Sequence, residues 1–186
     1  MTNADELKSL LRHYVRRSGV EDMIHVLEKS DFFIAPASTR FHGSYQGGLV
    51  KHSISVFNNL MNLREGVDGL SETSEESIAI VSLLHDVCKT GYYKVDYRNA
   101  KNERGQWEKV PYYTVDDKFP YGHGEKSVIM IQECMKLTTE ELMAIRWHMG
   151  AYSGQQDWNT LGRAFDQYQL AMYLHFADMM DTHKPN

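Results

Sequence analysis

Residues 83–91 read LLHDVCKTG and place a histidine beside an aspartate at the end of an apolar run with helical periodicity. Adjacent residues on a helix point about 100° apart and are not expected to pair with each other, so a local ion pair does not explain why His85 and Asp86 are neighbours. Some other group must use both side chains. The residues on either side of this stretch indicate the fold around it and the nature of that group.

Apolar residues recur at helical spacing through most of the chain. Helices are predicted at about residues 4–17, 20–29, 49–64, 124–136, 140–149 and 161–182, together with a helix that Ser71 or Ser74 caps and that ends at His85 and Asp86. Residues 92–117 break the pattern with two β-prone runs around a polar turn, which predicts a small hairpin-like excursion. The expected fold class is therefore all-α, a helical bundle with this one excursion.

The composition is typical of a globular protein. The chain has 186 residues, 42% hydrophobic and 24% charged, which fits one soluble domain over residues 1–186. The net charge of −5 argues against a broad basic face for duplex nucleic acid, although it leaves room for a small basic pocket. Two cysteines far apart and a start without signal-peptide features favour a cytoplasmic protein. No apolar run approaches the roughly 18 residues of a membrane span.

Several polar residues fall on the apolar sides or at the ends of different predicted helices. They are His52, His85, His123, His148 and Asp178, and Asp86 follows directly after His85. One such histidine alone is more often a hydrogen-bonded core residue than a ligand. Burying several imidazoles and carboxylates together costs too much free energy unless they are paired or bind a cation. The repeated pattern therefore favours a metal site.

The order of His52, His85-Asp86 and Asp178 resembles the HD phosphohydrolase superfamily, an all-helical fold in which these four side chains hold a divalent metal. His123 and His148 match the longer pattern of its binuclear members. The resemblance runs from FHGSYQGGLVKHS through LLHDVCKTG, FPYGHGEKS and IRWHMG to LHFADMMD, which covers most of the chain. It implies one HD domain over residues 1–186, in which Asp86 can bridge two ions.

This ligand set also indicates which metals fit. Imidazole and carboxylate ligands suit Mn²⁺, Fe²⁺, Co²⁺, Ni²⁺ or Zn²⁺, and the absence of cysteine ligands argues against a closed structural zinc site. Two such ions, roughly 3.5 to 4 Å apart, would activate a water and steady the attacking and leaving oxygens of a phosphoester. The expected cofactor is therefore a divalent transition metal, as two ions.

Other residues are candidates for substrate contacts. By the resemblance, Lys89 is the lysine of an HDxxK motif and contacts phosphate or the bridging ligand, so Lys89 and Asp86 are the expected catalytic residues; an ordinary helix-end cation is the alternative for Lys89. Arg40 and His42 precede a Gly-Gly pair and would face substrate oxygens, which an exposed loop explains equally well. Cys88 stands where the family usually has glycine, and packing is its expected role.

Two candidates for orienting the ligands lie one helical turn on either side of Asp178. They are His175 and Asp181, which would form hydrogen bonds to the metal ligands.

The function that these observations favour is a metal-dependent phosphohydrolase. Its substrate would be a phosphomonoester or phosphodiester, such as a nucleotide or a short single-stranded oligonucleotide, with no duplex and no membrane as partner. The alternative is a mixed-valent di-iron oxygenase, because a minority of HD proteins use the same six ligands to activate O₂. A catalytically silent binding domain is the third interpretation. The oligomeric state does not follow from the sequence.

Overall fold

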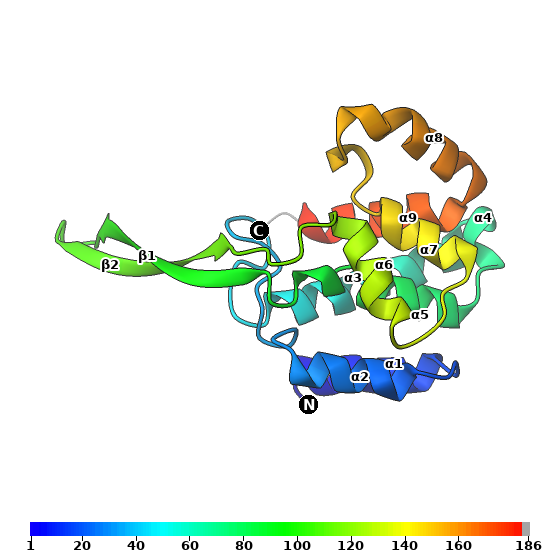
Figure 1. Ribbon diagram of the computed structural model, residues 1–186, viewed down its shortest axis with the longest axis horizontal. Helices are drawn as coiled ribbons and strands as arrows, with labels where there is room; N and C mark the ends of the chain where they lie inside the picture. The colour runs from blue at the N-terminus through cyan, green and yellow to red at the C-terminus, as the bar shows by residue number, and fades with distance from the viewer. Residues whose placement is uncertain (184–186) are drawn as a thin grey trace.

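A computed structural model describes residues 1–183 of the chain, and helices make up most of it (Figure 1). The helices are α1 (Asn3–Tyr14), α2 (Val20–Lys29), α3 (Gly48–Gly66), α4 (Asp68–Ser71), α5 (Glu75–Leu84), α6 (His123–Gln132), α7 (Thr139–Trp147), α8 (Trp158–Gln167) and α9 (Gln169–Thr182). Short 3₁₀ turns follow α5 at Val87–Lys89 and precede α8 at Gly150–Tyr152 and Gln155–Asp157. Two strands, β1 (Tyr93–Lys101) and β2 (Trp107–Val115), interrupt the helical series.

The expected all-α class is corrected by these two strands, since the fold is mainly helical with a small antiparallel sheet. The strands pair with Tyr93 opposite Val115 and Lys101 opposite Trp107, so the excursion predicted over residues 92–117 is a β-hairpin. In its turn, the side chain of Asn102 accepts hydrogen bonds from the backbone N–H groups of residues 104 and 106. We call this hairpin, residues 93–115, the arm, because it projects away from the helices (Figure 1).

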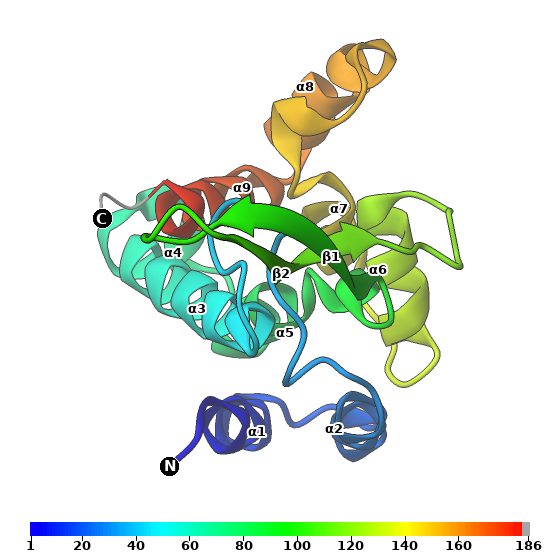
Figure 2. The same ribbon diagram turned by 90° about the vertical axis from the view of Figure 1, so that its left-hand side faces the viewer.

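Helix α5 lies at the centre of the helical part, which we call the body. All its residues from Ile78 to Leu84 are buried, as expected for a helix whose sequence is apolar on every side. It packs against α3, α1 and α7, while α9 packs against α3 and α7. In both views α1 and α2 cover one side of this core and α8 lies on the opposite side (Figures 1 and 2). Because α5 is central, its end, with His85 and Asp86, lies in the interior of the body.

An ion pair fixes α7 relative to α5 and to the segment between α1 and α2. The fully buried carboxylate of Glu141 accepts two hydrogen bonds from Arg17, at 2.6 and 2.9 Å, and one from Ser77 at 2.8 Å. Glu141 also closes a capping box with Thr138 at the start of α7. Although burial opposes ionisation, the hydrogen bonds from Arg17 and Thr138 lower the pKa of Glu141, so the carboxylate is charged.

The helix predicted over residues 161–182 is wrong in one respect, because the chain breaks it into α8 and α9 at Tyr168 (φ −130°, ψ 84°). The break lets α8 fold back beside α9 (Figure 1). Leu161 and Ala164 of α8 thereby join the core. A continuous helix would carry these two side chains beyond the core. No helix within residues 1–183 has both the length and the apolar character needed to cross a membrane.

Candidate metal centre

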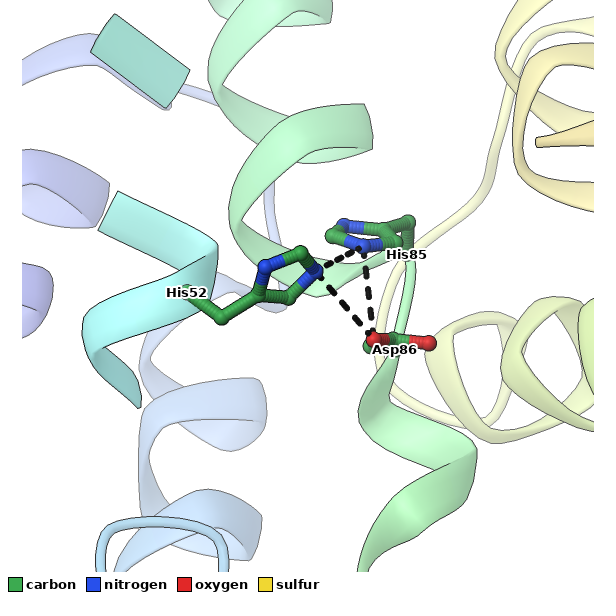
Figure 3. Close-up of side chains that lie close together, drawn as sticks. All are labelled: His52, His85 and Asp86. Carbon is green, nitrogen blue, oxygen red and sulfur yellow. Dashed lines mark hydrogen bonds and ion pairs between the residues drawn. The ribbon is translucent and has the colours of Figure 1, made fainter. Parts of the chain in front are cut away.

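Six polar side chains from five helical segments meet inside the body. His52 comes from α3, His85 and Asp86 from the end of α5, His123 from the start of α6, His148 from the end of α7, and Asp178 from α9. Figure 3 shows the first three pointing toward one another. His52 Nε2 lies 3.3 Å from His85 Nε2, and each of these nitrogens lies 3.5 Å from Asp86 Oδ2.

These side chains form three overlapping groups that are able to hold a metal ion. The groups are His52, His85 and Asp86; His85, His148 and Asp178; and Asp86, His123 and His148. Within each group the ligand atoms lie within 4.8 Å of one another. Together the groups contain all six residues that the sequence pattern singled out as metal ligands. We call these six residues the cluster.

The positions of His85 and His148 at helix ends explain their orientation. Each residue is the C-cap of its helix, where the last backbone carbonyls lack partners within the helix. His85 Nδ1 lies 2.8 Å from the carbonyl of Ser82, and His148 Nδ1 lies 2.6 Å from that of Ile145. A carbonyl only accepts, so Nδ1 carries the hydrogen in both rings and Nε2 of a neutral ring presents its lone pair to the cluster.

Asp86 connects two halves of the cluster, because His123 lies at its Oδ1 and His52 and His85 lie at its Oδ2. Its Oδ1 accepts a hydrogen bond from His123 Nε2 at 2.7 Å, and its Oδ2 accepts one from Lys89 Nζ at 2.6 Å. Burial opposes ionisation of this carboxyl, but the positive charge of Lys89, together with the neighbouring His85, holds its pKa well below the usual range. The carboxylate is therefore charged and presents both oxygens to neighbouring ligand groups.

His52 is held by carboxylates at both ring nitrogens. Its Nδ1 donates to Asp181 Oδ2 at 2.7 Å, while Nε2 lies 3.3 Å from Asp178 Oδ1. The hydroxyl of Thr182 donates to the same Asp178 oxygen at 3.2 Å. Burial disfavours the imidazolium, but the two carboxylates outweigh it and raise the pKa of His52 to about 9.

His123 has a similar electrostatic environment at the other end of the cluster. Burial lowers its affinity for a proton, whereas Cys88 and Asp86 raise the pKa to about 9. The Sγ atom of Cys88 lies 3.5 Å from His123 Nδ1. Cys88 itself is buried, in agreement with the packing role expected from the sequence.

The two residues expected to orient the ligands have different contacts. Asp181 reaches a cluster residue directly, through the hydrogen bond to His52 Nδ1. His175 Nδ1 instead donates to the backbone carbonyl of His148 at 2.7 Å, so it supports the chain beside the ligand rather than the ligand ring. Thr182 was missed by the sequence analysis, and only its spacing of four residues from Asp178 could have indicated it.

A cavity of about 430 Å³ opens onto the cluster at Asp86 and Asp178. Lys89 and His42 line it, together with the apolar side chains Phe41, Met149, Tyr152 and Met179. We call it the cluster cavity. Arg40, also expected to face substrate, does not line this cavity but two neighbouring hollows. Within residues 1–183 neither ring nitrogen of His42 has a hydrogen-bond partner, and its ring centroid lies 5.0 Å from that of His52.

Comparison with known proteins gives one partial relative. Over 85 residues the chain is 32% identical to the dihydroneopterin 2',3'-cyclic phosphate phosphodiesterase of Methanocaldococcus jannaschii. The match covers 44% of this chain and 31% of that enzyme, so the chain spans about a third of the length of the relative. No protein-family model and no solved structure matches the chain. The chain is thus similar in part to a phosphodiesterase, and its buried histidines and aspartates are positioned to hold a metal ion.

Proposed function

We propose that this chain is a metal-dependent phosphodiesterase of the HD type, with the six cluster residues as ligands of two divalent transition-metal ions. The observation that carries the proposal is the set of three ligand groups that overlap at His85, Asp86 and His148. The partial similarity to a phosphodiesterase supports the same reaction class. The resemblance of the sequence to the HD superfamily further supports one HD domain over residues 1–186 as the proposed unit.

The chemistry of the cluster fits such ions. Four imidazoles and two carboxylates, without a thiolate, are the ligands that Mn²⁺, Fe²⁺, Co²⁺, Ni²⁺ and Zn²⁺ accept in catalytic sites. His148 Nε2 is buried and has no hydrogen-bond partner within residues 1–183, while the nearest carboxylate oxygen of Asp86 lies 3.6 Å away. A buried nitrogen without a partner costs free energy that a bound cation would recover.

When bound, ions of this kind supply Lewis acidity and lower the pKa of water. Lys89 would stabilise the negative charge that builds on the phosphoryl oxygens. Its ammonium is held 2.6 Å from Asp86 and lines the cluster cavity. Burial disfavours the charge, but Asp86 raises the pKa of Lys89 above its usual value, so the residue stays cationic. A fixed cation in a water-poor site costs no reorganisation during the reaction.

His42 would position the substrate through a neutral ring. Burial and the neighbouring positive charges of His52 and Lys89 lower the pKa of His42. At neutral pH the imidazole therefore offers one N–H donor and one acceptor to the cavity, and neither is used by the described part of the chain. It can orient oxygens of the ester without adding a second cation.

The walls of the cluster cavity suggest what the ester carries. Phe41 and Tyr152 are mostly exposed at its edge, and Met149 and Met179 line it further in. Aromatic and methionine side chains favour a flat, partly apolar ring. The volume of about 430 Å³ lies in the usual range for a small-molecule site. The proposed substrate is therefore a nucleotide-like phosphodiester.

The test compares esters and metals. Protein loaded in turn with Mn²⁺, Fe²⁺, Co²⁺ or Ni²⁺ is assayed with bis(p-nitrophenyl) phosphate, p-nitrophenyl phosphate and a 2',3'-cyclic nucleotide, alongside elemental analysis. We expect about two equivalents of metal, hydrolysis of the diesters, and loss of both after chelation. If the protein contains no metal after expression in a metal-replete medium, the proposal is contradicted. Oxygen-dependent turnover of an organic substrate without ester hydrolysis would favour the oxygenase interpretation instead.

A further inference from the structure

Two hollows continue from the cluster cavity toward the arm. The first, of about 740 Å³, shares Phe41, His42, Thr182 and His183 with the cluster cavity. The second, of about 750 Å³, lies between residues 39–44 and the arm and shares Arg40 with the first. In Figure 1 the arm begins next to this segment at the edge of the body. We call the two hollows together the groove, and its inner end reaches the cluster at His52.

The groove has an unusual charge for this protein. Three cations line it, Lys51, Arg40 and Arg98. The acidic residue that lines it is Asp181, whose carboxylate is hydrogen-bonded to His52. The whole chain has 25 acidic and 20 basic residues, so an average surface would be acidic. The lysine and arginine ion pairs within residues 1–183 are made by Lys8, Arg12, Arg17, Arg64, Lys89, Lys118, Lys126 and Arg146, and none involves these three cations. Their charges are thus free to meet an anionic ligand.

Two of the three cations stand next to an aromatic ring. Lys51 Nζ lies 5.8 Å from the ring centroid of Tyr45, and the Arg98 guanidinium lies 5.5 Å from that of Tyr112. Tyr45 and Tyr112 line the first and the second hollow respectively. Cations that follow a backbone, interleaved with aromatic faces for bases, are the pattern that binds single-stranded nucleic acid. Each hollow also has the volume of a typical small-ligand site, enough for a nucleotide-sized unit.

From this geometry we infer that the groove is an extended binding site for a single-stranded oligonucleotide, which runs from the cluster across Arg40 to Arg98 and Tyr112 on the arm. The inference rests on the proposed function for the chemistry at the cluster, and it adds that the substrate is a polymer and that the arm binds it. Duplex is excluded as the occupant, because its bases are stacked within the helix and cannot reach Tyr45 or Tyr112.

The arm supplies a matched control. Arg98 pairs with Val110, whereas Lys109 pairs with Asn99, so the side chains of Arg98 and Lys109 lie on opposite faces of the hairpin. Both are exposed cations, and only Arg98 lines the groove. Arg98→Ala and Lys109→Ala therefore remove the same charge from the same arm. Only the first removes it from the proposed path of the strand.

The experiment measures hydrolysis and binding separately. Oligoribonucleotides of 2, 4, 8 and 12 residues, the 12-mer duplex and bis(p-nitrophenyl) phosphate are compared as substrates, and binding of a fluorescent 12-mer is followed by polarisation. We expect KM to fall at least tenfold between 2 and 8 residues, with little change in kcat. Arg98→Ala should raise KM for the 8-mer about tenfold more than KM for the small ester, while Lys109→Ala leaves both near wild type.

Salt dependence identifies the lost contact as one with phosphate. The slope of log K against log salt should decrease by about 0.7 in Arg98→Ala, as expected for one phosphate contact with a single strand. Equal KM at all lengths, equal effects of the two variants, or binding of duplex as tight as of single strand would overturn the inference. A dimer that dissociates in Arg98→Ala, seen by sedimentation, would likewise assign the groove to a second copy of the chain.

The two proposals fail in distinguishable ways. If small diesters are hydrolysed but KM does not depend on length, the groove is wrong and the phosphodiesterase stands. If no ester is hydrolysed with any metal but the 12-mer binds in an Arg98-dependent manner, the proposed function is wrong and the groove stands.

Discussion

The body and the arm hold their polar residues in opposite ways. In the body, His52, His85 and Asp86 are at most 3% exposed, and each has a further partner that fixes its orientation: Asp181, the carbonyl of Ser82, and Lys89. In the arm, most side chains are exposed on both faces, and the hairpin is held mainly by its own ladder. The body therefore holds its polar side chains in fixed positions, as a reaction site requires, whereas the arm exposes its side chains to solvent, where they can contact a ligand.

The largest expected effect comes from a change in the cluster. Asp86→Asn keeps the size of the side chain but removes the charge that connects both halves of the cluster. We expect metal content to fall sharply and diester hydrolysis to drop on the order of 10³-fold or more. Asp96→Asn is the same substitution on the exposed arm and should retain the metal. Elemental analysis of both variants decides, and a wild-type metal content in Asp86→Asn would assign the cluster to another role.

Lys89 separates electrostatic catalysis from metal binding. Lys89→Ala should lower kcat about 10²-fold, because one preorganised cation is lost at the cluster cavity, while metal content stays near wild type. Lys89→Arg should restore little, since a planar fork does not replace a compact ammonium. Lys94→Ala removes an equivalent charge from the arm and serves as the control. Full turnover in Lys89→Ala would make the residue an ordinary helix-end cation.

Asp181 tests whether orientation of a ligand matters as much as its presence. Asp181→Asn weakens the hydrogen bond that turns His52 Nε2 toward the cluster, so metal affinity should fall about 10- to 100-fold. Competition with a chelator of known affinity measures this change. Asp166→Asn, on the exposed side of α8, is the matched control. If both variants bind metal equally well, the contact between Asp181 and His52 has no orienting role.

The pH dependence of stability should differ between metal-free and metal-loaded protein. Burial opposes the charge, yet carboxylates raise the pKa of His52 to about 9, and the pKa of His123 is raised to about 9 as well. A histidine whose pKa is higher in the folded than in the unfolded state, where it is near 6.5, stabilises the fold at pH values below 6.5. This stabilisation is lost as the pH rises through about 9. The free energy of unfolding of chelated protein should therefore decrease between pH 6.5 and 9.

Metal binding should show the reverse trend. Protons must leave His52 and His123 before their nitrogens can bind an ion, so apparent metal affinity should rise with pH over the same range. Urea denaturation at several pH values, with and without metal, tests both trends. His52→Gln should flatten the slope of the chelated protein, while His13→Gln, at an exposed position, should not. A chelated protein that gains stability toward pH 9 would contradict the assigned direction.

The smallest effect is expected on the arm. Tyr97 is 62% exposed, so Tyr97→Ser should change the free energy of unfolding by no more than about 0.5 kcal/mol. Leu83→Ala, in the fully buried part of α5, should cost about 2 to 5 kcal/mol. Denaturant titration of the two variants measures the contrast. A cost above about 1 kcal/mol for Tyr97→Ser would mean that the arm packs against something in solution.

Much of the body follows from the sequence because its signals are local. The 3.6-residue spacing predicted α2 over Val20–Lys29 and, to within a few residues at their ends, α1, α3, α5, α6 and α7. The polar turn predicted the hairpin. The break at Tyr168 could not be predicted, since no proline or glycine stands within residues 163–171 and the cause is tertiary: Leu161 and Ala164 reach the core only if α8 folds back.

For the candidate site, the sequence provided the residue types and their helices but not their contacts. Six ligand candidates could be named from a pattern, and Asp181 from its spacing to Asp178. That Asp181 binds the far nitrogen of His52, 129 positions away in sequence, depends on the packing of α9 against α3. For Arg40, the position itself differs from the one expected. Its motif placed it near the substrate, yet it lines the groove rather than the cluster cavity, because residues 39–44 lie beside the arm.

The placement of His85 and His148 at the ends of their helices has an electrostatic consequence that is independent of their rings. Helices α5 and α7 both end at the cluster, and the two imidazole centroids lie only 4.9 Å apart. A helix carries the equivalent of about half a negative charge at its C-terminus, from its aligned peptide dipoles. The direction in which these two helices run therefore sets a negative potential at the point where they meet. This contribution comes from the backbone of α5 and α7 and would remain in a variant stripped of all six side chains, set against the opposite contribution from the start of α6 at His123.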